Sequence, residues 1–208
     1  FTVPRRYVNL KYISSGAQGI VVSADDTVSK ERVAIKKLIN PFDHPVTARR
    51  TYREMVLLSG SQHKNIIELR SVFTPNKNVN DFTEIYLVME LFPYNLHAVA
   101  RTHNLKHNFL SYFVYQLLCA VNHLHKEGII HRDLKPSNVV VNEHCDLKIL
   151  DFGLARIQPE DGRMSNCVVT RHYRAPEVII EQTYNEKVDV WSIGCIFGEL
   201  IKRRTLFP

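Results

Sequence analysis

The chain has few cysteines, and their spacing suggests neither a metal site nor a disulfide framework. Its four cysteines lie far apart, at Cys119, Cys145, Cys167 and Cys195. Disulfide-rich secreted domains and zinc sites need closely spaced cysteines, so we expect reduced thiols in an intracellular protein. The apolar stretch 111–125 is too short and too polar to span a membrane, and residues 1–11 lack the apolar core of a signal peptide.

Positive charge is in excess but is not gathered into one run. The formal net charge is +6, and the short basic clusters lie at 49–53 and 202–204. Such clusters can meet nucleic acid, but they are more often solvated helix faces or phosphate contacts, and no recognition motif accompanies them. We therefore expect no nucleic-acid partner. Internal repeats and low-complexity segments are also missing, and the 45% hydrophobic content is ordinary for a globular protein.

The first 90 residues have the pattern of short strands interrupted by one helix. Segments 6–13, 19–24 and 32–39 are rich in β-branched and aromatic residues, and 71–75 and 84–91 have the same character. Residues 46–60 instead predict a helix that stops at Gly60. The apolar side chains near helical spacing in it are Ala48, Tyr52, Met55, Val56 and Leu58.

The rest of the chain is predicted to be mainly helical. Residues 106–128 carry apolar side chains around most of a helix, as a buried helix should, and end at Gly128. Two short strands at 139–142 and 146–150 follow, and 187–204 is another mostly apolar helix. We expect a small strand-rich lobe over residues 1–90, a linker at 91–95 and a larger helical lobe over 96–208.

A glycine turn and a lysine within a strand form the first candidate site. Gly16 and Gly19 let a turn approach a ligand closely, with backbone N–H groups facing phosphate. Lys36 ends the apolar run "VAIK", and such a lysine is usually paired, with Glu54 as the candidate partner. The alternative is an outward-facing, solvated lysine. The glycine turn joins two strands instead of opening a helix, which argues against a dinucleotide-binding enzyme.

The motifs "HRDLKPSN" and "DFG" carry the groups that phosphoryl transfer needs. Asp133 can accept a proton from an attacking hydroxyl, Lys135 can neutralise a phosphate, and Asn138 can hold a metal ion. Asp151 follows the apolar strand "LKIL", so its carboxylate must be hydrogen-bonded, metal-bound or solvated. Mg²⁺ ligation is the specific hypothesis for Asp151, and a loop-capping aspartate is the alternative. The motifs occur in the order that phosphoryl transfer from ATP requires.

Together these motifs resemble the mitogen-activated class of eukaryotic protein kinases, and in particular the c-Jun N-terminal kinases. The resemblance extends from Arg6 to Pro208 and rests on "GAQGIV", "VAIKKL", "YRE", "HKNII", "IHRDLKPSN", "LKILDFGLAR" and "VVTRHYRAPEV". It implies an α+β, two-lobed protein-kinase fold with a small antiparallel β lobe and a mainly helical, truncated C-terminal lobe. It also implies a serine/threonine kinase of stress signalling in the cytoplasm and nucleus.

The resemblance implies that ATP lies between the lobes. Lys36, tied to Glu54, would bind its α- and β-phosphates, and Asn95 would lie close to its ribose. Ser14 replaces the first glycine of the family's phosphate loop, from which we expect weaker ATP binding at most. The other positions implied to line the nucleotide site are Gly16, Gly19, Val21, Ala34, Met89, Glu90 and Leu91.

Catalytic and metal-binding roles follow from the same resemblance. Asp133 would orient a serine or threonine hydroxyl, with Lys135 on the γ-phosphate. Asn138 and Asp151 would hold two Mg²⁺ ions, and positioning and electrostatics would supply most of the catalysis. Asp189 at the start of the last helix should brace the catalytic loop.

The activation segment departs from the family pattern. The family carries Thr-x-Tyr, phosphorylated by an upstream kinase, whereas this chain has Ser165 and Cys167 at the aligned positions. The resemblance implies that three arginines converge on a phosphate at Ser165, namely Arg53, Arg132 and Arg156. The usual partners of the tyrosine phosphate are present as Arg171 and Arg174.

Three interpretations of this departure stay open. The kinase is switched by Ser165 alone, or it is a duplicate whose regulation has decayed. In the third interpretation Cys167, between Arg171 and Arg174, is sensitive to oxidation, against the alternative of an inert thiol.

The family's C-terminal lobe continues past the end of this sequence, so we expect a fragment or a naturally truncated product. The last helix would then have partly uncovered apolar side chains, at Trp191, Ile193, Ile196 and Phe197. Our first interpretation is a proline-directed kinase with protein substrates, an upstream kinase and scaffold or docking proteins, and no membrane partner. The competing one is a pseudokinase-like binding module without turnover.

Overall fold

The computed structural model describes residues 1–16, 19–38, 40–78, 82–157 and 171–208. The chain divides into two compact units, one made of Phe1–Gly60 and Ile67–Leu91, the other of Ser61–Ile66 and Phe92–Pro208. The lobe boundaries given above remain a prediction. Ser165 and Cys167, on which the activation switch depends, lie outside the described residues.

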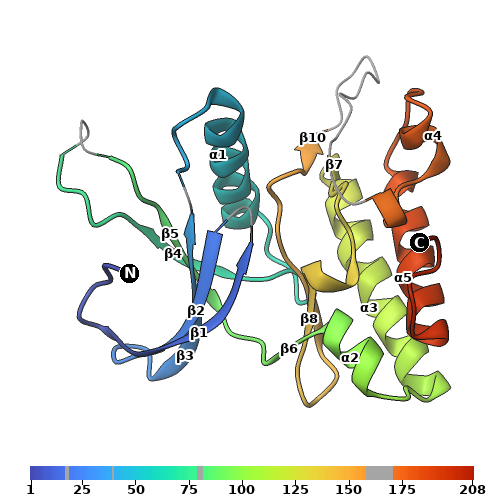
Figure 1. Ribbon diagram of the computed structural model, residues 1–208, viewed down its shortest axis with the longest axis horizontal. Coiled ribbons are helices and arrows are strands. Elements are labelled where there is room, and N and C mark those ends of the chain that lie inside the picture. The colour runs from blue at the N-terminus through green and yellow to red at the C-terminus, as the bar shows by residue number, and fades with distance from the viewer. Residues whose placement is uncertain (17–18, 39, 79–81, 158–170) are drawn as a thin grey trace. The chain divides into compact units, whose positions relative to one another are not determined.

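The first unit is an antiparallel sheet with one helix beside it (Figure 1). The order of its strands is β1-β2-β3-β5-β4. The strands are β1 Tyr7–Gly16, β2 Gly19–Asp26, β3 Glu31–Leu38, β4 Leu69–Phe73 and β5 Tyr86–Glu90, and the helix is α1 Pro45–Gly60. All five predicted strands and the predicted helix are present, because runs rich in β-branched and aromatic residues and one helical run are bounded by turn residues.

Each face of this sheet has its own apolar cluster, because successive side chains of a strand point to opposite faces. One cluster contains Ile35 of β3 and Tyr86 and Val88 of β5, all buried. On the other, Leu38 and Leu87 pack with Met55 of α1. The helix therefore covers the face that also carries Lys36, two positions from Leu38.

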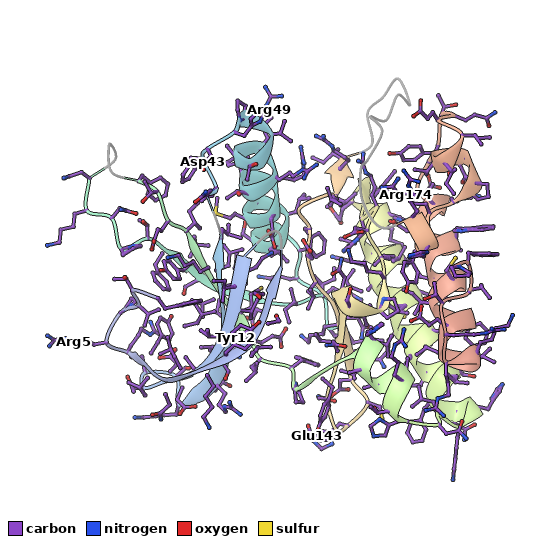
Figure 2. All side chains as sticks on the ribbon, viewed as in Figure 1. Arg5, Tyr12, Asp43, Arg49, Glu143 and Arg174 are labelled. Carbon is purple, nitrogen blue, oxygen red and sulfur yellow. The ribbon has the colours of Figure 1, made fainter. Side chains whose placement is uncertain are left out.

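The exposed side of α1 is both basic and apolar. Arg49 (Figure 2) is exposed near its start, and so is Arg50, as expected of a solvated helix face. Tyr52 and Val56, which share the predicted apolar spacing, are 67% and 45% exposed. Leu58 of the predicted set is buried, and the helix also buries Thr51, Glu54 and Leu57.

Gly19 is sterically required where β1 turns into β2. A Cβ atom on Gly19 would clash with the carbonyl oxygen of Lys37 on β3, whereas a Cβ atom on Gly16 would meet nothing within 4 Å. Gly19→Ala should therefore lower the free energy of unfolding by about 2 kcal/mol, because backbone must move. Gly16→Ala, the matched control, should change it by less than about 1 kcal/mol. Urea unfolding measures both, and equal losses would contradict the argument.

Asp26 fastens the N-terminal segment to the sheet. Its carboxylate pairs with the Arg6 guanidinium, whose Nε donates at 3.0 Å, and also accepts from the Val28 N–H and the Ser29 hydroxyl, each at 3.0 Å. The hydrogen bond from Arg6 holds the pKa of Asp26 well below its usual range, although burial acts the other way. The folded state thus binds the Asp26 proton less readily than the unfolded state does.

This pairing predicts a pH-dependent contribution to stability. Because the pKa of Asp26 is depressed on folding, its contribution should be complete above the unfolded value near 4 and should fade as the pH falls below it. The difference in thermal unfolding midpoint between wild type and Asp26→Asn should accordingly shrink between about pH 5 and pH 2. Arg6→Gln should give the same profile, and a pH-independent difference would refute the assignment.

The second unit is mainly helical, with α3 and α5 packed together (Figure 1). Its helices are α2 Leu96–Thr102, α3 His107–Lys126, α4 Pro176–Ile179 and α5 Lys187–Lys202. Short strands form two small sheets, from β6 Tyr94–Asn95, β7 Ile129–Ile130, β8 Val139–Val141, β9 Leu147–Ile149 and β10 Arg156–Ile157. The described residues of this unit also form the 3₁₀ turns η2 Pro136–Asn138 and η3 Arg171–Tyr173. Gly128 follows the end of α3, as predicted, and has a left-handed φ of 69°.

The prediction that α3 is buried around most of its surface is wrong. Its buried face holds Phe113, Leu117, Ala120, Val121 and Leu124. Phe109, Tyr112, Tyr115 and Leu118 are 42–57% exposed. Within the described residues α3 packs chiefly on α5 and the short strands β7 and β9, so only one side of it is covered.

The expectation for α5 is half correct. Trp191 and Phe197 are each 39% exposed, as expected, but Ile193 and Ile196 are 3% and 0% exposed. Helical spacing places these two isoleucines on the side of α5 that packs on α3, whereas Trp191 stacks on Phe207 at 5.9 Å between ring centroids. Among the described helices, none is long and apolar enough to cross a membrane.

Candidate active site

Lys36 and Glu54 form a buried ion pair in the first unit. The Lys36 Nζ lies 2.6 Å from Glu54 Oε1, and the two side chains are 11% and 5% exposed. The predicted pairing is confirmed, and the alternative of a solvated Lys36 is excluded. A buried ammonium is tolerated only with such a partner, so the pair fixes the position of one positive charge on the helix-covered face of the sheet.

Strand pairing brings several predicted nucleotide-site residues to that same face. Val21 pairs with Lys36 and Ala34 with Met89, and directly paired residues of an antiparallel sheet point to the same side. The other positions lie on the same unit: Ser14 and Gly16 end β1, Gly19 begins β2, Glu90 ends β5 and Leu91 follows it. Glu90 Oε1 accepts a hydrogen bond from the Glu68 N–H at 2.8 Å, which ties β5 to the segment before β4.

Asn95 belongs to the second unit and has a structural role that the sequence analysis missed. Its Oδ1 accepts a hydrogen bond from the Ala98 N–H at 2.8 Å and so caps the N-terminus of α2. Asparagine just before a helical run is a known capping signal, and it could have been found from the sequence. The cap uses the side-chain oxygen, so any contact to a ribose would fall to Nδ2.

Asp133 is the centre of the polar cluster in the second unit. It is 7% exposed, and its Oδ2 accepts from Lys135 Nζ at 2.8 Å and from Asn138 Nδ2 at 3.0 Å. Asn138 Nδ2 also donates to the Asp133 backbone oxygen at 2.9 Å. Both side chains donate to the same oxygen, so Oδ1 is not engaged by either of them. The carboxylate is therefore oriented through one oxygen while the other keeps its capacity to accept.

Asp189 holds the backbone of this loop. Its side chain is 0% exposed and accepts from the N–H groups of His131 and Arg132, each at 2.8 Å, and from His125 Nε2 at 2.9 Å. The expectation that Asp189 braces the catalytic loop is confirmed. Its partners lie 57 to 64 residues away in sequence, so α5 rather than local sequence determines the shape of the loop.

His131 connects the loop to the strand before Asp151. Its Nδ1 accepts from the Asp133 N–H at 3.3 Å, and its Nε2 lies 3.2 Å from the Leu150 carbonyl oxygen. A ring nitrogen that accepts carries no proton, so the ring is neutral and Nε2 donates. The ring also stands edge-on to the buried Phe152. One imidazole thus links the backbone of Asp133 to that of Leu150, next to Asp151, a role that sequence analysis did not assign.

Asn138 and Asp151 are brought together by the backbone. The Leu150 N–H donates to the Asn138 carbonyl oxygen at 3.0 Å, and Asp151 is the next residue. Asp151 has a left-handed φ of 70° and Arg132 one of 69°, a conformation that costs a residue other than glycine about 1 kcal/mol or more. Strain of this kind persists where the surrounding structure holds a side chain in place.

The oxygen ligands that Asn138 and Asp151 can offer suit Mg²⁺. Asn138 and Asp151 offer amide and carboxylate oxygens, the hard ligands that Mg²⁺ prefers. No group of three His, Cys, Asp or Glu side chains able to hold a metal occurs in the described part of the chain.

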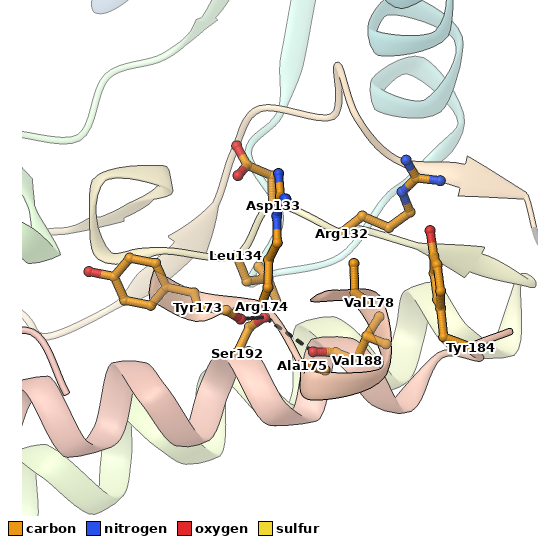
Figure 3. A pocket seen from close by; sticks show the side chains of 10 residues that line it. All are labelled: Arg132, Asp133, Leu134, Tyr173, Arg174, Ala175, Val178, Tyr184, Val188 and Ser192. Atoms are coloured by element: carbon orange, nitrogen blue, oxygen red, sulfur yellow. Dashed lines mark hydrogen bonds between the residues drawn. The ribbon is translucent and has the colours of Figure 1, made fainter. Parts of the chain in front are cut away.

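Two arginines with unused hydrogen-bond donors line a pocket beside Asp133. Figure 3 shows Arg132 and Arg174 with Asp133, above Ser192, whose hydroxyl donates to the Tyr173 carbonyl oxygen at 2.7 Å. Arg132 Nε and Nη1 and Arg174 Nη2 are buried without a hydrogen-bond partner among the described residues. Unused guanidinium donors favour an anion, in line with the phosphate-binding role expected of these arginines.

The other predicted regulatory arginines are distributed over both units. Arg53 is half-buried on α1 of the first unit, and Arg156 pairs with Ile130 through the backbone of β10 and β7 in the second. Arg171 is exposed in η3. The convergence of Arg53, Arg132 and Arg156 on Ser165 stays a prediction.

Comparison with known proteins agrees with this arrangement. A model of the protein kinase domain family matches residues 7–208. The chain is 58% identical over its full length to GLH-binding kinase 1 of Caenorhabditis elegans, covering 54% of that protein. It is 55% and 54% identical over its full length to the stress-activated protein kinases JNK of Suberites domuncula and Drosophila melanogaster, covering 57% and 56% of them. The chain thus spans about half the length of the curated relatives it matches, and it belongs to the protein kinase domain family.

Proposed function

We propose that the protein is a serine/threonine kinase of the mitogen-activated type, which transfers the γ-phosphate of ATP to hydroxyl groups of protein substrates. The observation that carries the proposal is the geometry of Asp133. Its carboxylate is oriented through Oδ2 by Lys135 and Asn138, on a loop that the buried Asp189 holds in place. The second oxygen is left to accept the hydrogen of a substrate hydroxyl.

The remaining roles follow from the same residues. Lys36, paired with Glu54, would bind the α- and β-phosphates, and Lys135 would reach the γ-phosphate. Asn138 and Asp151 would hold Mg²⁺, which offsets the negative charge of the phosphates when ATP is bound. Because Lys135 donates to Asp133, it would orient the carboxylate while it contacts the transferring group.

Substrate choice and regulation are extended from the relatives. Two of the relatives described above are named stress-activated protein kinases, which supports a role in stress signalling. The resemblance of the segment up to Arg171 to that of proline-directed kinases favours proline-directed substrates, with an upstream kinase acting on Ser165. Scaffold or docking proteins would be the further partners, and the cytoplasm and nucleus the expected location. A binding module without turnover is not favoured, since Lys36, Asp133, Asn138 and Asp151 are all present.

Phosphate transfer from Mg·ATP to a Ser-Pro peptide tests the proposal, with a Ser-Ala peptide of otherwise identical sequence as control. We expect kcat/KM at least about 10-fold higher for Ser-Pro, and a further rise in Ser165→Glu if one phosphorylation site activates the enzyme. Lys36→Met should reduce transfer to both peptides, because it removes the charge that binds the phosphates. A folded protein that binds Mg·ATP and transfers no phosphate would disprove kinase activity.

A further inference from the structure

Glu199 of α5 is a buried carboxylate with only one of its oxygens hydrogen-bonded. The residue is 1% exposed. Its Oε2 accepts from the Tyr173 hydroxyl at 2.5 Å, whereas Oε1 is buried without a hydrogen-bond partner among the described residues. An unpaired oxygen on a buried carboxylate is unfavourable, because the group has lost its water without gaining a donor. A nearby donor would therefore stabilise the folded state.

His97 of α2 is placed to supply that donor. Its Nδ1 lies 3.7 Å from Glu199 Oε1, and its Nε2 accepts a hydrogen bond from Arg101 Nε at 3.2 Å. Because Nε2 accepts, the neutral ring carries its proton on Nδ1, which faces Glu199 from beyond hydrogen-bond length. Protonation adds a positive charge to the ring and draws it toward the carboxylate. The His97 side chain is 45% exposed, so solvent can deliver the proton.

The other charged and titratable side chains near the pair are Tyr173, Cys195, Arg101 and Arg203. Burial, followed by the hydrogen bond and the charge of Glu199, raises the pKa of Tyr173 above its usual range, and burial raises the pKa of the Cys195 thiol. Both stay neutral near pH 7. Arg101 and Arg203 are positive, and Arg203 Nη2 donates to the Arg101 carbonyl oxygen at 2.6 Å. Arg101 opposes protonation of His97, but its exposed guanidinium can turn away.

We propose that protonated His97 of α2 binds the free oxygen of Glu199 on α5. Because Glu199 also binds Tyr173 of η3, this contact makes a pH-sensitive link between α2, α5 and η3. In the linked state the imidazolium Nδ1–H donates to Glu199 Oε1 while the Tyr173 hydroxyl stays on Oε2. Tyr173 is also held at its carbonyl oxygen by Ser192 and directly precedes Arg174, which lines the pocket beside Asp133. The link therefore steadies the segment that presents Arg174.

Titration of the imidazole signals by NMR tests the link directly. The His97 ring should titrate at a pH at least half a unit higher in wild type than in Glu199→Gln, a roughly threefold difference in proton affinity. Glutamine keeps an oxygen for the Tyr173 hydroxyl, removes the charge and places an NH2 group where Oε1 faces His97. His103, exposed at the end of the same helix, should titrate identically in the two proteins. Equal titration of His97 in both would overturn the proposal.

Thermal unfolding gives a second readout that is independent of kinase activity. Relative to His97→Gln, wild type should gain stability as the pH falls from about 8 to about 5.5, because the pair forms only when His97 is protonated. In a double-mutant cycle, the effects of His97→Gln and Glu199→Gln on the unfolding equilibrium constant should differ from additivity by about threefold to fivefold at pH 5.5. At pH 8 the two effects should be additive. Coupling that is the same at both pH values would refute a proton-dependent link. If Glu199→Gln does not fold, a pH-independent difference between wild type and His97→Gln would refute it as well.

Discussion

Replacing Asp133 with asparagine is expected to lower the rate of phosphate transfer by about 10²- to 10⁴-fold, the range typical for loss of a general base. Asparagine has nearly the same shape and keeps an oxygen for Lys135 and Asn138, which both donate to Oδ2 in the wild type. The loop should therefore keep its geometry, while the carboxylate that we propose accepts the proton of the substrate hydroxyl is gone. The effect should fall on kcat, with the affinity for Mg·ATP unchanged.

Ser137→Ala is the matched control for this change. Ser137 lies in the same loop but is exposed, so the variant should keep its transfer rate within about twofold, as expected for a surface position. Thermal unfolding of Asp133→Asn should stay within a few degrees of the wild type, which separates loss of chemistry from loss of fold. Wild-type turnover by a folded Asp133→Asn protein would remove Asp133 from the reaction.

Asp189→Asn should have the largest effect on stability. An asparagine cannot accept all three hydrogen bonds that His125, His131 and Arg132 donate to the Asp189 carboxylate. At least one buried backbone N–H would lose its partner, and the charge-assisted character of the others would be lost, at a cost of about 3 kcal/mol. The thermal unfolding midpoint should fall by about 6–12 °C.

The same substitution should also slow the reaction in protein that remains folded. Because Asp189 fixes the backbone two residues before Asp133, its loss lets the loop shift, and a displacement of about 1 Å can lower the rate by about 100-fold. Glu186→Gln removes a charge from the same end of α5, where the side chain makes no capping hydrogen bond, and should cost less than about 1 kcal/mol. If Asp189→Asn were as stable as Glu186→Gln, the brace would have no energetic role.

Much of the first unit could be predicted from the sequence because its signals are local. Short runs rich in β-branched residues mark β2 and β3. A lysine at the end of such an apolar run requires a partner wherever the fold buries it. Glu54 lay on the adjacent helix, so the pair Lys36–Glu54 needed no knowledge of distant contacts.

The second unit was less predictable because its polar contacts join distant parts of the chain. Tyr173 and Glu199 are 26 residues apart, and His131 reaches Leu150 across 19 residues; neither pair has a local signature. The pattern of α3 shows which side chains would gain from burial but not which neighbours cover them, so the exposure of Tyr112 and Tyr115 could not be foreseen.

Arg132 and Asp151 have a left-handed backbone, so a substitution that stabilises the fold at these positions is expected to weaken activity. Glycine adopts this conformation without steric penalty, so glycine at either position should relieve strain and strengthen the fold by up to about 1 kcal/mol. It would do so by deleting a guanidinium or a carboxylate from the site. A search for more stable variants of this protein would therefore select, at these positions, sequences that bind phosphate or Mg²⁺ less well.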